Sequence, residues 1–266
     1  MTIYSDTPAA LIGCAGWSLP RQSASHFPEQ GSHLQRYAAV FSAVEINSCF
    51  YRAHRTQTWA RWGECVPAAF RFSVKLPRAI THDQRLIGVD GLLDQFAAEA
   101  GALGDKLGCV LVQLPPSLQF DAPVAADFFA RLRVRFACML ACEARHPTWF
   151  GEEATAVLQA AGVTRVIADP AKGQPGPHVP TAHDIYLRLH GSPLVYRSDY
   201  EPAFLAQLGH DMAGHLAAGR QVWCVFDNTM SRSYVDQAVA LQDVVRAAAA
   251  AHVCDSGQAD CPIPDR

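Results

Sequence analysis

Short apolar runs alternate with amphipathic stretches along the whole chain. Eight of these runs are rich in β-branched residues, and each is short enough to form one strand. They occupy residues 11–17, 43–51, 70–77, 108–116, 137–146, 164–170, 185–191 and 221–228. Nearly continuous hydrophobicity is typical of parallel strands that are covered on both faces. The pattern therefore predicts a parallel sheet with helices packed around it.

Most segments between these runs carry apolar residues at helical spacing. In the segment 33–41, Leu34, Tyr37 and Phe41 share one helix face. Further helices are expected in 90–106, near 128–132 and 157–161, in 204–216 and in 235–251. One connection differs, because the sequence AKGQPGPHVPTAH after the sixth run is too rich in Gly and Pro for a helix. We expect a loop in place of the sixth helix.

Eight strands that alternate with helices favour an α/β fold of the (β/α)8 TIM-barrel type, which a chain of 266 residues suits. An open doubly wound sheet is the alternative. The first run is followed by GWSLP and not by a glycine-rich phosphate loop, so a dinucleotide fingerprint is absent. We expect one barrel domain over residues 1–252 and a disordered tail over 253–266.

Composition narrows the possible partners and the compartment. The net charge is -3 and no run of Lys and Arg occurs, which argues against a nucleic-acid partner. No segment reaches the ~18 apolar residues of a membrane span, and no secretory signal is visible. The nine cysteines form no CxxC pair, so we expect reduced structural thiols in the cytoplasm. The oligomeric state stays open.

Polar residues gather where the predicted strands end, and that end carries the active site in TIM barrels. They are Glu45, Asn47, Lys75, Gln113, Glu143, Arg145, His146, Asp169, Arg188, His190, Asp227 and Asn228. Because side chains alternate along a strand, residues two apart, such as Glu143 and Arg145, are expected to face the barrel axis together. Unpaired charges there would cost several kcal/mol each, so they must neutralise one another or meet a ligand.

Further candidates lie on loops or strand ends at the same end of the expected barrel. They are Trp17, Tyr51, His82, Trp149 and Tyr196. Aromatic rings in these positions can stack on a sugar or on an aromatic ligand. The alternative for the aromatic residues is packing in the core or in a lid, and it stays open at this stage.

Six ordered motifs carry a family resemblance. VEINSCFYR, FRFSVKLPRAITH, GCVLVQLPPSLQF, EARHPTWF, YLRLHG and VFDN resemble the YecE-like family, also called domain of unknown function seventy-two. The resemblance covers the chain from Gly13 to about Leu241. It implies a TIM-barrel fold and does not imply a particular reaction. Members usually carry Asn-Ala after the Asp-Asn of the last strand, whereas this chain reads DNTMSRSYVDQA.

A metal-independent acid/base enzyme acting on a small anionic or sugar-like ligand is our first hypothesis, with a lyase, isomerase or hydrolase type of reaction. Lys75, Arg145, Arg188 and His190 would supply the positive charge. Either Glu143 or Glu45 would transfer the proton. Lys75 is also a candidate nucleophilic amine, if its surroundings lower its pKa.

Three alternatives remain. A divalent metal held by Glu45, Glu143, His190 or Asp227 would make the protein a sugar isomerase or a phosphate hydrolase, although no HExxH motif supports it. Paired carboxylates would suit a glycoside hydrolase. A non-catalytic ligand-binding protein is also consistent with the fold.

We expect no cofactor, with a divalent metal as the alternative. The alternative to a functional site is a set of structural ion pairs, formed by Glu45 with Lys75 and by Glu143 with Arg145 or Arg188.

Overall fold

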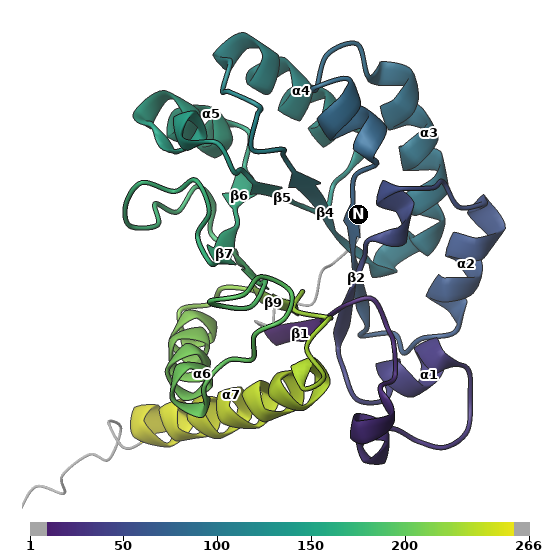
Figure 1. Ribbon diagram of the computed structural model, residues 1–266, viewed down its shortest axis with the longest axis vertical. Helices are drawn as coiled ribbons and strands as arrows, with labels where there is room; N and C mark the ends of the chain where they lie inside the picture. Colours follow the sequence, from purple (N-terminus) through teal and green to yellow (C-terminus); the bar gives the residue numbers. More distant parts are fainter. Residues whose placement is uncertain (1–9, 258–266) are drawn as a thin grey trace, which may run out of the picture.

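Nine parallel strands form one sheet that closes into a barrel in the computed structural model, which describes the backbone of residues 10–257 and side chains to position 251 (Figure 1). Their order around the barrel is β6-β5-β4-β3-β2-β1-β9-β8-β7. The strands are β1 Ala10–Ala15, β2 Ala43–Ile46, β3 Arg71–Lys75, β4 Leu107–Gln113, β5 Met139–Glu143, β6 Val163–Arg165, β7 Ile167–Asp169, β8 Ile185–Leu189 and β9 Val222–Phe226. The expected α/β barrel is confirmed.

The sixth predicted strand is divided in two, and this accounts for nine strands in place of eight. β6 pairs with β5, and β7 pairs with β8. Val166 lies between the two, and its N–H donates to the carbonyl of Cys142 at 3.0 Å. One extended segment therefore changes partners at Val166 and joins the two halves of the barrel.

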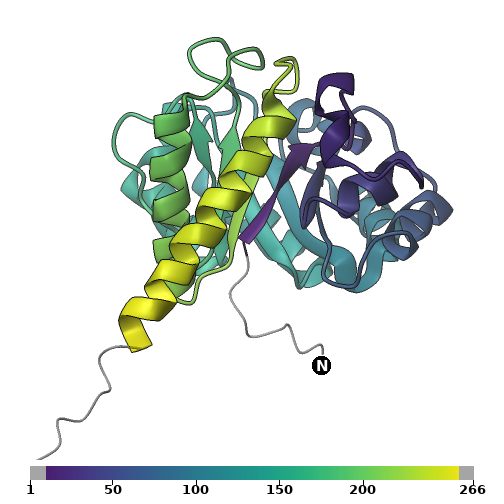
Figure 2. The same ribbon diagram turned by 90° about the horizontal axis from the view of Figure 1, so that it is seen from below.

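Seven α-helices surround the described strands, and α7 crosses the outside of the sheet beside α6 (Figure 2). The helices are α1 His33–Ala38, α2 Thr56–Glu64, α3 Asp90–Ala100, α4 Ala122–Arg135, α5 Glu152–Ala160, α6 Pro202–Ala217 and α7 Tyr234–Gly257. None of them is long and apolar enough to cross a membrane. Residues 258–266, most of the expected tail, lie outside the described part.

The connection between β7 and β8, residues 170–184, contains no helix, as its glycines and prolines predict. Thr181 Oγ1 fastens this loop to the barrel by accepting from the N–H of Arg165 at 2.8 Å and donating to the carbonyl of Val163 at 2.6 Å. The long loop is therefore attached to the first half of the interrupted strand.

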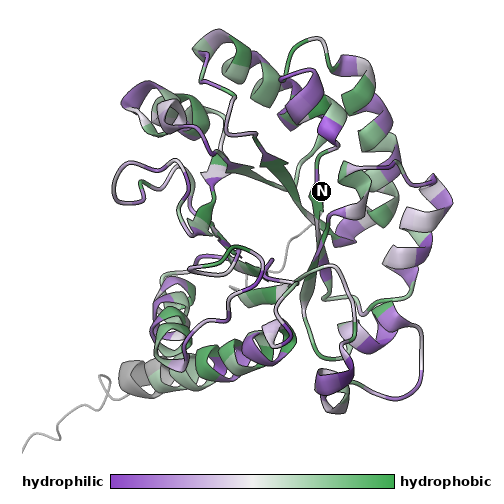
Figure 3. Cartoon of the chain, in the orientation of Figure 1, coloured by the Kyte–Doolittle hydropathy of each residue, from purple (hydrophilic) through white to green (hydrophobic). Residues whose placement is uncertain are grey.

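Two apolar layers lie on opposite faces of the strands, which are mostly hydrophobic in Figure 3. The outer layer contains Ile46, Ala144 and Leu189 together with helix residues such as Phe128. The inner cluster fills the barrel and consists of Leu11, Ala43, Cys109, Leu111, Ala141, Val166, Tyr186, Trp223 and Val225. Because strand side chains alternate, the polar residues next to Ile46, Ala144 and Leu189 face the barrel interior.

Candidate functional site

Arg188 occupies the centre of the barrel mouth and is 1% exposed. Its Nε and Nη2 donate to the two carboxylate oxygens of Glu45 at 2.9 and 2.6 Å. Its Nη1 donates to Glu143, and Nη2 also lies 3.2 Å from Oδ2 of Asp227. Strands β2, β5 and β9 thus each place one carboxylate at or just past their ends around a single guanidinium from β8. The planar fork of arginine suits this arrangement of several acceptors.

His190 lies between two of the same carboxylates. Its Nδ1 is 2.9 Å from Oδ2 of Asp227, and its Nε2 is 3.2 Å from Oε1 of Glu143. Burial lowers the pKa of His190, but the hydrogen bonds to Asp227 and Glu143 outweigh burial and raise it above its ordinary value. The site therefore favours an imidazolium that donates to one carboxylate from each ring nitrogen.

Glu143 is 2% exposed and is held ionised by its surroundings. Burial by itself would raise the pKa of Glu143, but Arg188, His190 and Arg145 together hold it well below its usual range. Arg145 approaches the carboxylate with Nε at 2.8 Å and Nη2 at 2.7 Å from Oε1. A carboxylate stabilised by three cationic groups is a poor proton donor, so its geometry suits an electrostatic role better than an acid role.

A chain of hydroxyl groups continues this network into the barrel. The Tyr186 hydroxyl donates to Oε2 of Glu45 at 2.9 Å and lies 2.7 Å from the Ser73 hydroxyl. The Tyr186 ring stacks on Trp223 with 5.8 Å between the ring centroids. The polar network therefore ends on an apolar layer, and every carboxylate at the mouth has a hydrogen-bonding partner.

Lys75 differs from these residues because no carboxylate lies within 4 Å of its ammonium in the described part of the chain. Its Nζ lies 4.0 Å from the centroid of the Phe50 ring, a cation–π contact. Burial and the charge of Arg188 lower the pKa of Lys75, although nearby carboxylates oppose this shift. Of the ion pairs in the structural alternative, those of Glu143 with Arg145 and Arg188 form, whereas Glu45 pairs with Arg188 and not with Lys75.

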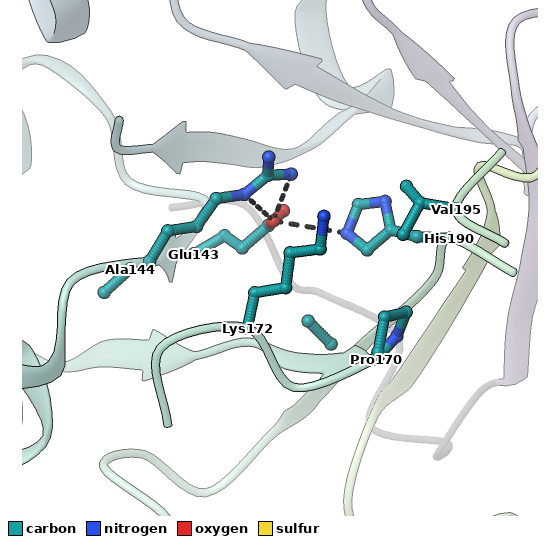
Figure 4. Close-up of a pocket in the computed structure, with 8 residues that line it drawn as sticks. Glu143, Ala144, Pro170, Lys172, His190 and Val195 are labelled. Atoms are coloured by element: carbon teal, nitrogen blue, oxygen red, sulfur yellow. Dashed lines mark hydrogen bonds and ion pairs between the residues drawn. The ribbon is translucent and has the colours of Figure 1, made fainter. Parts of the chain in front are cut away.

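A second lysine, Lys172, reaches the mouth from the loop between β7 and β8, and we did not predict it. It lines a pocket with Glu143, Arg145, His190 and Val195, where its side chain extends toward the space between the carboxylate and the imidazole ring (Figure 4). The volume open to a water molecule is about 10 Å³, enough for about one water. None of the described carboxylates lies within 4 Å of its ammonium.

Gly173 fixes the position of Lys172. Its φ is +78°, and a Cβ at this position would lie 2.2 Å from the carbonyl oxygen of Arg145. Only glycine tolerates both the left-handed backbone and this close approach. The loop therefore packs directly on the end of β5 and presents Lys172 to the pocket. Lys172 is one of three lysines in the sequence, with Lys75 and Lys106, a signal available before the structure.

Four other expected residues surround the mouth without joining the ion-pair network. The side-chain oxygen of Asn47 is buried and has no hydrogen-bond partner among the described residues. Gln113 donates to a neighbouring backbone carbonyl at 2.7 Å. Tyr51 is 80% exposed, and its ring and that of His82 each lie edge-on to Phe50. These residues provide polar and aromatic contacts on the Lys75 side of the mouth.

Four more expected residues are directed elsewhere. Trp17 packs edge-on against a tryptophan of α2 with 5.1 Å between centroids. Trp149 is buried, and its indole N–H donates to a carbonyl of the β4–α4 loop at 3.0 Å. His146 lies 2.9 Å from a threonine hydroxyl two residues later. Asn228 donates to a carbonyl of the β8–α6 loop at 3.1 Å. Through these contacts they stabilise the segments around the mouth.

Tyr196 and Asp169 belong to the side of the mouth next to His190. The Tyr196 ring lies edge-on to the imidazole of His190, with 6.0 Å between centroids. Asp169 accepts from the hydroxyl of Tyr200 through both its backbone carbonyl and its side chain, each at 3.1 Å. The loop after β8 is thus anchored to the end of β7 and holds an aromatic ring beside the histidine.

Comparisons with known proteins agree with this architecture. The model of the family described as protein of unknown function DUF72 matches residues 11–260. The UPF0759 protein YecE of Escherichia coli K12 is 31% identical over 164 residues, which cover 59% of this chain and 58% of that protein. The match thus spans less than two thirds of the relative. The UPF0759 protein YunF of Bacillus subtilis is 28% identical over 203 residues, 68% of this chain and 69% of that protein.

Solved structures with a similar fold include two proteins of the same family. A DUF72 family protein from Enterococcus faecalis superposes with a TM-score of 0.75 at 19% identity, covering 90% of this chain and 96% of that chain. One from Thermotoga maritima superposes with a TM-score of 0.73 at 23% identity, covering 89% and 99%. At these identities the likeness shows the fold alone.

Proposed function

Because this chain belongs to the family described as protein of unknown function DUF72, its chemistry has to be inferred from the site, and we propose that the barrel mouth binds a small anion. The ligand class is a carboxylate or a phosphate ester, and the reaction is a proton transfer that needs no metal ion. The protein acts in the cytoplasm. The network around Arg188 orients the charges, and Lys75 and Lys172 receive the ligand.

The observation that carries this proposal is the charge left over at the mouth. The carboxylates of Glu45, Glu143 and Asp227 are engaged by Arg188, Arg145 and His190. Lys75 and Lys172 add positive charge, and no described carboxylate lies within 4 Å of either ammonium. A mouth with excess positive charge attracts an anion, and the limited solvent access at Lys75 strengthens the attraction there.

The pKa shifts assign different tasks to the titrating groups. His190, whose pKa is raised, is the proton donor, because it carries a proton closer to neutral pH than an ordinary histidine does. Lys75, whose pKa is lowered by burial and Arg188, binds the anion while it is protonated, and it can act as the base or the nucleophilic amine only after it has lost its proton. Glu143 stays ionised and holds His190 and Arg188 in place. This division replaces our first expectation that Glu143 or Glu45 transfers the proton.

The metal-dependent alternative is weakened by the place of Arg188. The carboxylates that a divalent cation needs already surround its guanidinium. The nitrogens of Arg188 lie 2.6 to 3.2 Å from oxygens of Glu45 and Asp227. A dication would have to displace a buried arginine and approach Lys75. Elemental analysis of the purified protein tests this alternative. A stoichiometric divalent metal that is lost in Glu143→Ala would overturn the metal-free proposal.

Calorimetric titration with inorganic phosphate and with acetate tests the anion site. We expect Lys75→Met and Lys172→Met each to weaken binding about tenfold, since each removes one positive charge that has no described carboxylate within 4 Å. The control is Arg246→Met, which removes an exposed positive charge on α7 that is paired with Asp243. It should change affinity less than twofold. Equal affinities in all four proteins, or no binding to the wild type, would refute the anion site.

Turnover separates an enzyme from a non-catalytic binder. Phosphorylated and carboxylated metabolites are incubated with the wild type and with His190→Gln, and loss of substrate is followed by mass spectrometry. We expect turnover that His190→Gln abolishes while anion binding persists. Glu143→Gln should also abolish turnover and leave the protein folded. Anion binding without turnover of any candidate would favour the binding protein instead.

A further inference from the structure

The pocket beside His190 is too narrow for a whole ligand. Its open volume of about 10 Å³ accepts about one water-sized group between Glu143, Arg145, Lys172 and His190. One oxygen of a carboxylate or a phosphate fits this space, but a ring or a carbon chain does not. The remainder of a bound anion must therefore lie outside the pocket, on the loops at its rim.

The rim beside His190 is formed by a loop with a strained backbone. Tyr196 has a φ of +69°, a left-handed conformation that non-glycine residues seldom adopt and that costs about 1–2 kcal/mol. Three backbone hydrogen bonds hold it there. Its N–H donates to the carbonyl of His190, and its own carbonyl accepts from Met230 at 3.0 Å and from Ser231 at 3.1 Å. Strain maintained in this way often marks a functional position.

This loop and the next one expose large apolar side chains to solvent. Leu194 is 64% exposed and Met230 is 61% exposed, and the partly exposed ring of Tyr196 lies edge-on to His190. Val195 lines the pocket itself. The hydrogen bond between Met230 and Tyr196 places the two loops next to each other. Two neighbouring loops, one of which lines the positively charged pocket through Val195, therefore carry exposed apolar side chains.

We propose that the ligand is an amphiphilic anion, whose charged group binds Lys172 and whose apolar body lies on Leu194, Tyr196 and Met230. This inference rests on the proposed anion site and names the class of ligand that the site takes. A purely polar anion such as a free sugar phosphate would leave these side chains in water. An uncharged apolar ligand would leave Lys172 without a counterion. Only a molecule with both parts uses the whole surface.

Straight-chain carboxylates from acetate to octanoate test the proposal by calorimetry. We expect the affinity of the wild type to rise about two- to fourfold with each added methylene, until the rim is covered. Leu194→Ser and Met230→Ser should each reduce this dependence on length and leave acetate binding unchanged. Lys172→Met should weaken the binding of all lengths by the same factor. The matched control is Val134→Ser, which replaces an 86% exposed apolar residue near the end of α4.

The outcomes separate this inference from the anion site. Acetate and octanoate that bind equally well, or Val134→Ser acting like Leu194→Ser, would overturn the amphiphilic ligand and leave the anion site standing. Failure of every carboxylate and of inorganic phosphate to bind would overturn both. Sedimentation velocity adds one more test. A wild-type dimer that Leu194→Ser dissociates would show that the apolar rim is an interface between copies, and would overturn the ligand proposal.

Discussion

Two arginines in the barrel wall are equally buried and have opposite surroundings. Arg188 is 1% exposed and is bonded to three carboxylates, whereas Arg165 on β6 is 2% exposed and contacts none of those in the described chain. Arg165 donates instead to the carbonyls of Val179 and Trp149 and to the hydroxyl of Thr155, each at 3.0 Å. Burial lowers the pKa of Arg165.

The difference shows that burial of a charge does not by itself identify a functional site. Arg165 faces the helical layer and joins three segments of the chain, which gives it a mechanical role in holding the loop 170–184. Arg188 faces the barrel interior and gathers ionisable groups whose pKa values it shifts. A cluster of perturbed ionisable groups is typical of functional sites, and it is the carboxylates around Arg188 that distinguish the two arginines.

Removal of Arg188 should have the largest effect on stability. In Arg188→Met, the carboxylates of Glu45 and Glu143 lose a shared counterion in a buried place, and we expect a loss of about 3–5 kcal/mol in the free energy of unfolding. Urea denaturation measures it. Combining Arg188→Met with Glu45→Gln should recover part of the loss. A loss below about 1 kcal/mol would mean that the network contributes little to the fold.

Removal of Arg165 should destabilise less and more locally. Arg165→Met leaves the carbonyls of Val179 and Trp149 without these donors, and the acceptor at the buried Trp149 then costs about 1–3 kcal/mol. We expect a total loss of about 2 kcal/mol by urea denaturation, with faster amide exchange in residues 170–184. Because no ion pair is lost, anion binding should weaken only through the displaced Lys172. A loss larger than that of Arg188→Met would reverse the comparison.

The pH dependence of the free energy of unfolding should be set by the carboxylates around Arg188, and Arg165 should not contribute to it. The pKa values of Glu143 and Asp227 are lowered in the folded protein, so their stabilisation is present above pH ~4.5 and is lost as pH falls through the folded values. The slope is about 1.4 kcal/mol per pH unit for each group. Glu143→Gln should flatten this acid limb, and Arg165→Met should keep it. Urea midpoints from pH 2 to 6 decide between these outcomes.

His190 adds the opposite trend on the alkaline side. Its pKa is raised on folding, so its contribution is complete below pH ~6.5 and is lost as pH rises through the folded value. The same denaturation series, extended to pH 9, should show this decline in the wild type. His190→Gln should abolish it. A decline of equal size in that variant would assign the trend to another group.

Lys172 gives the smallest expected effect on stability. It is exposed, and none of the described carboxylates pairs with it, so Lys172→Met should change the free energy of unfolding by less than about 0.5 kcal/mol. The same substitution is expected to weaken anion binding. A loss above 1 kcal/mol would place Lys172 within the structural network and remove the distinction between the charges that hold the mouth and those that receive a ligand.

The barrel could be predicted from sequence because strand and helix periodicities are local. The eight runs, the missing sixth helix and the inward direction of Glu143 and Arg145 all follow from such patterns. Helix α2 was not predicted, since its segment TQTWARWGE has few apolar residues. The break at Val166 was also missed, because a change of strand partner depends on how the barrel closes and leaves no mark in an apolar run.

The partners within the site could not be predicted. Arg188 and Glu45 are 143 positions apart, and only the strand order and register bring them together. The position of Lys172 depends on Gly173 packing against the end of β5, a contact between two loops. The sequence also could not show that Trp149 is buried. Residue types at strand ends indicate which groups meet at the mouth, but their hydrogen bonds require the structure.

The scarcity of lysine has a practical consequence for any binding assay. Lys75 is largely buried, and Lys106 donates through its ammonium to the carbonyl of Val66 at 2.6 Å, whereas Lys172 is exposed. Among the lysine side chains, an amine-reactive dye or sensor surface should therefore attach first at Lys172. The protein would then be attached through a residue of the barrel mouth, and the attachment would block the binding of a true ligand. Attachment through an engineered residue on α7 would keep the mouth free.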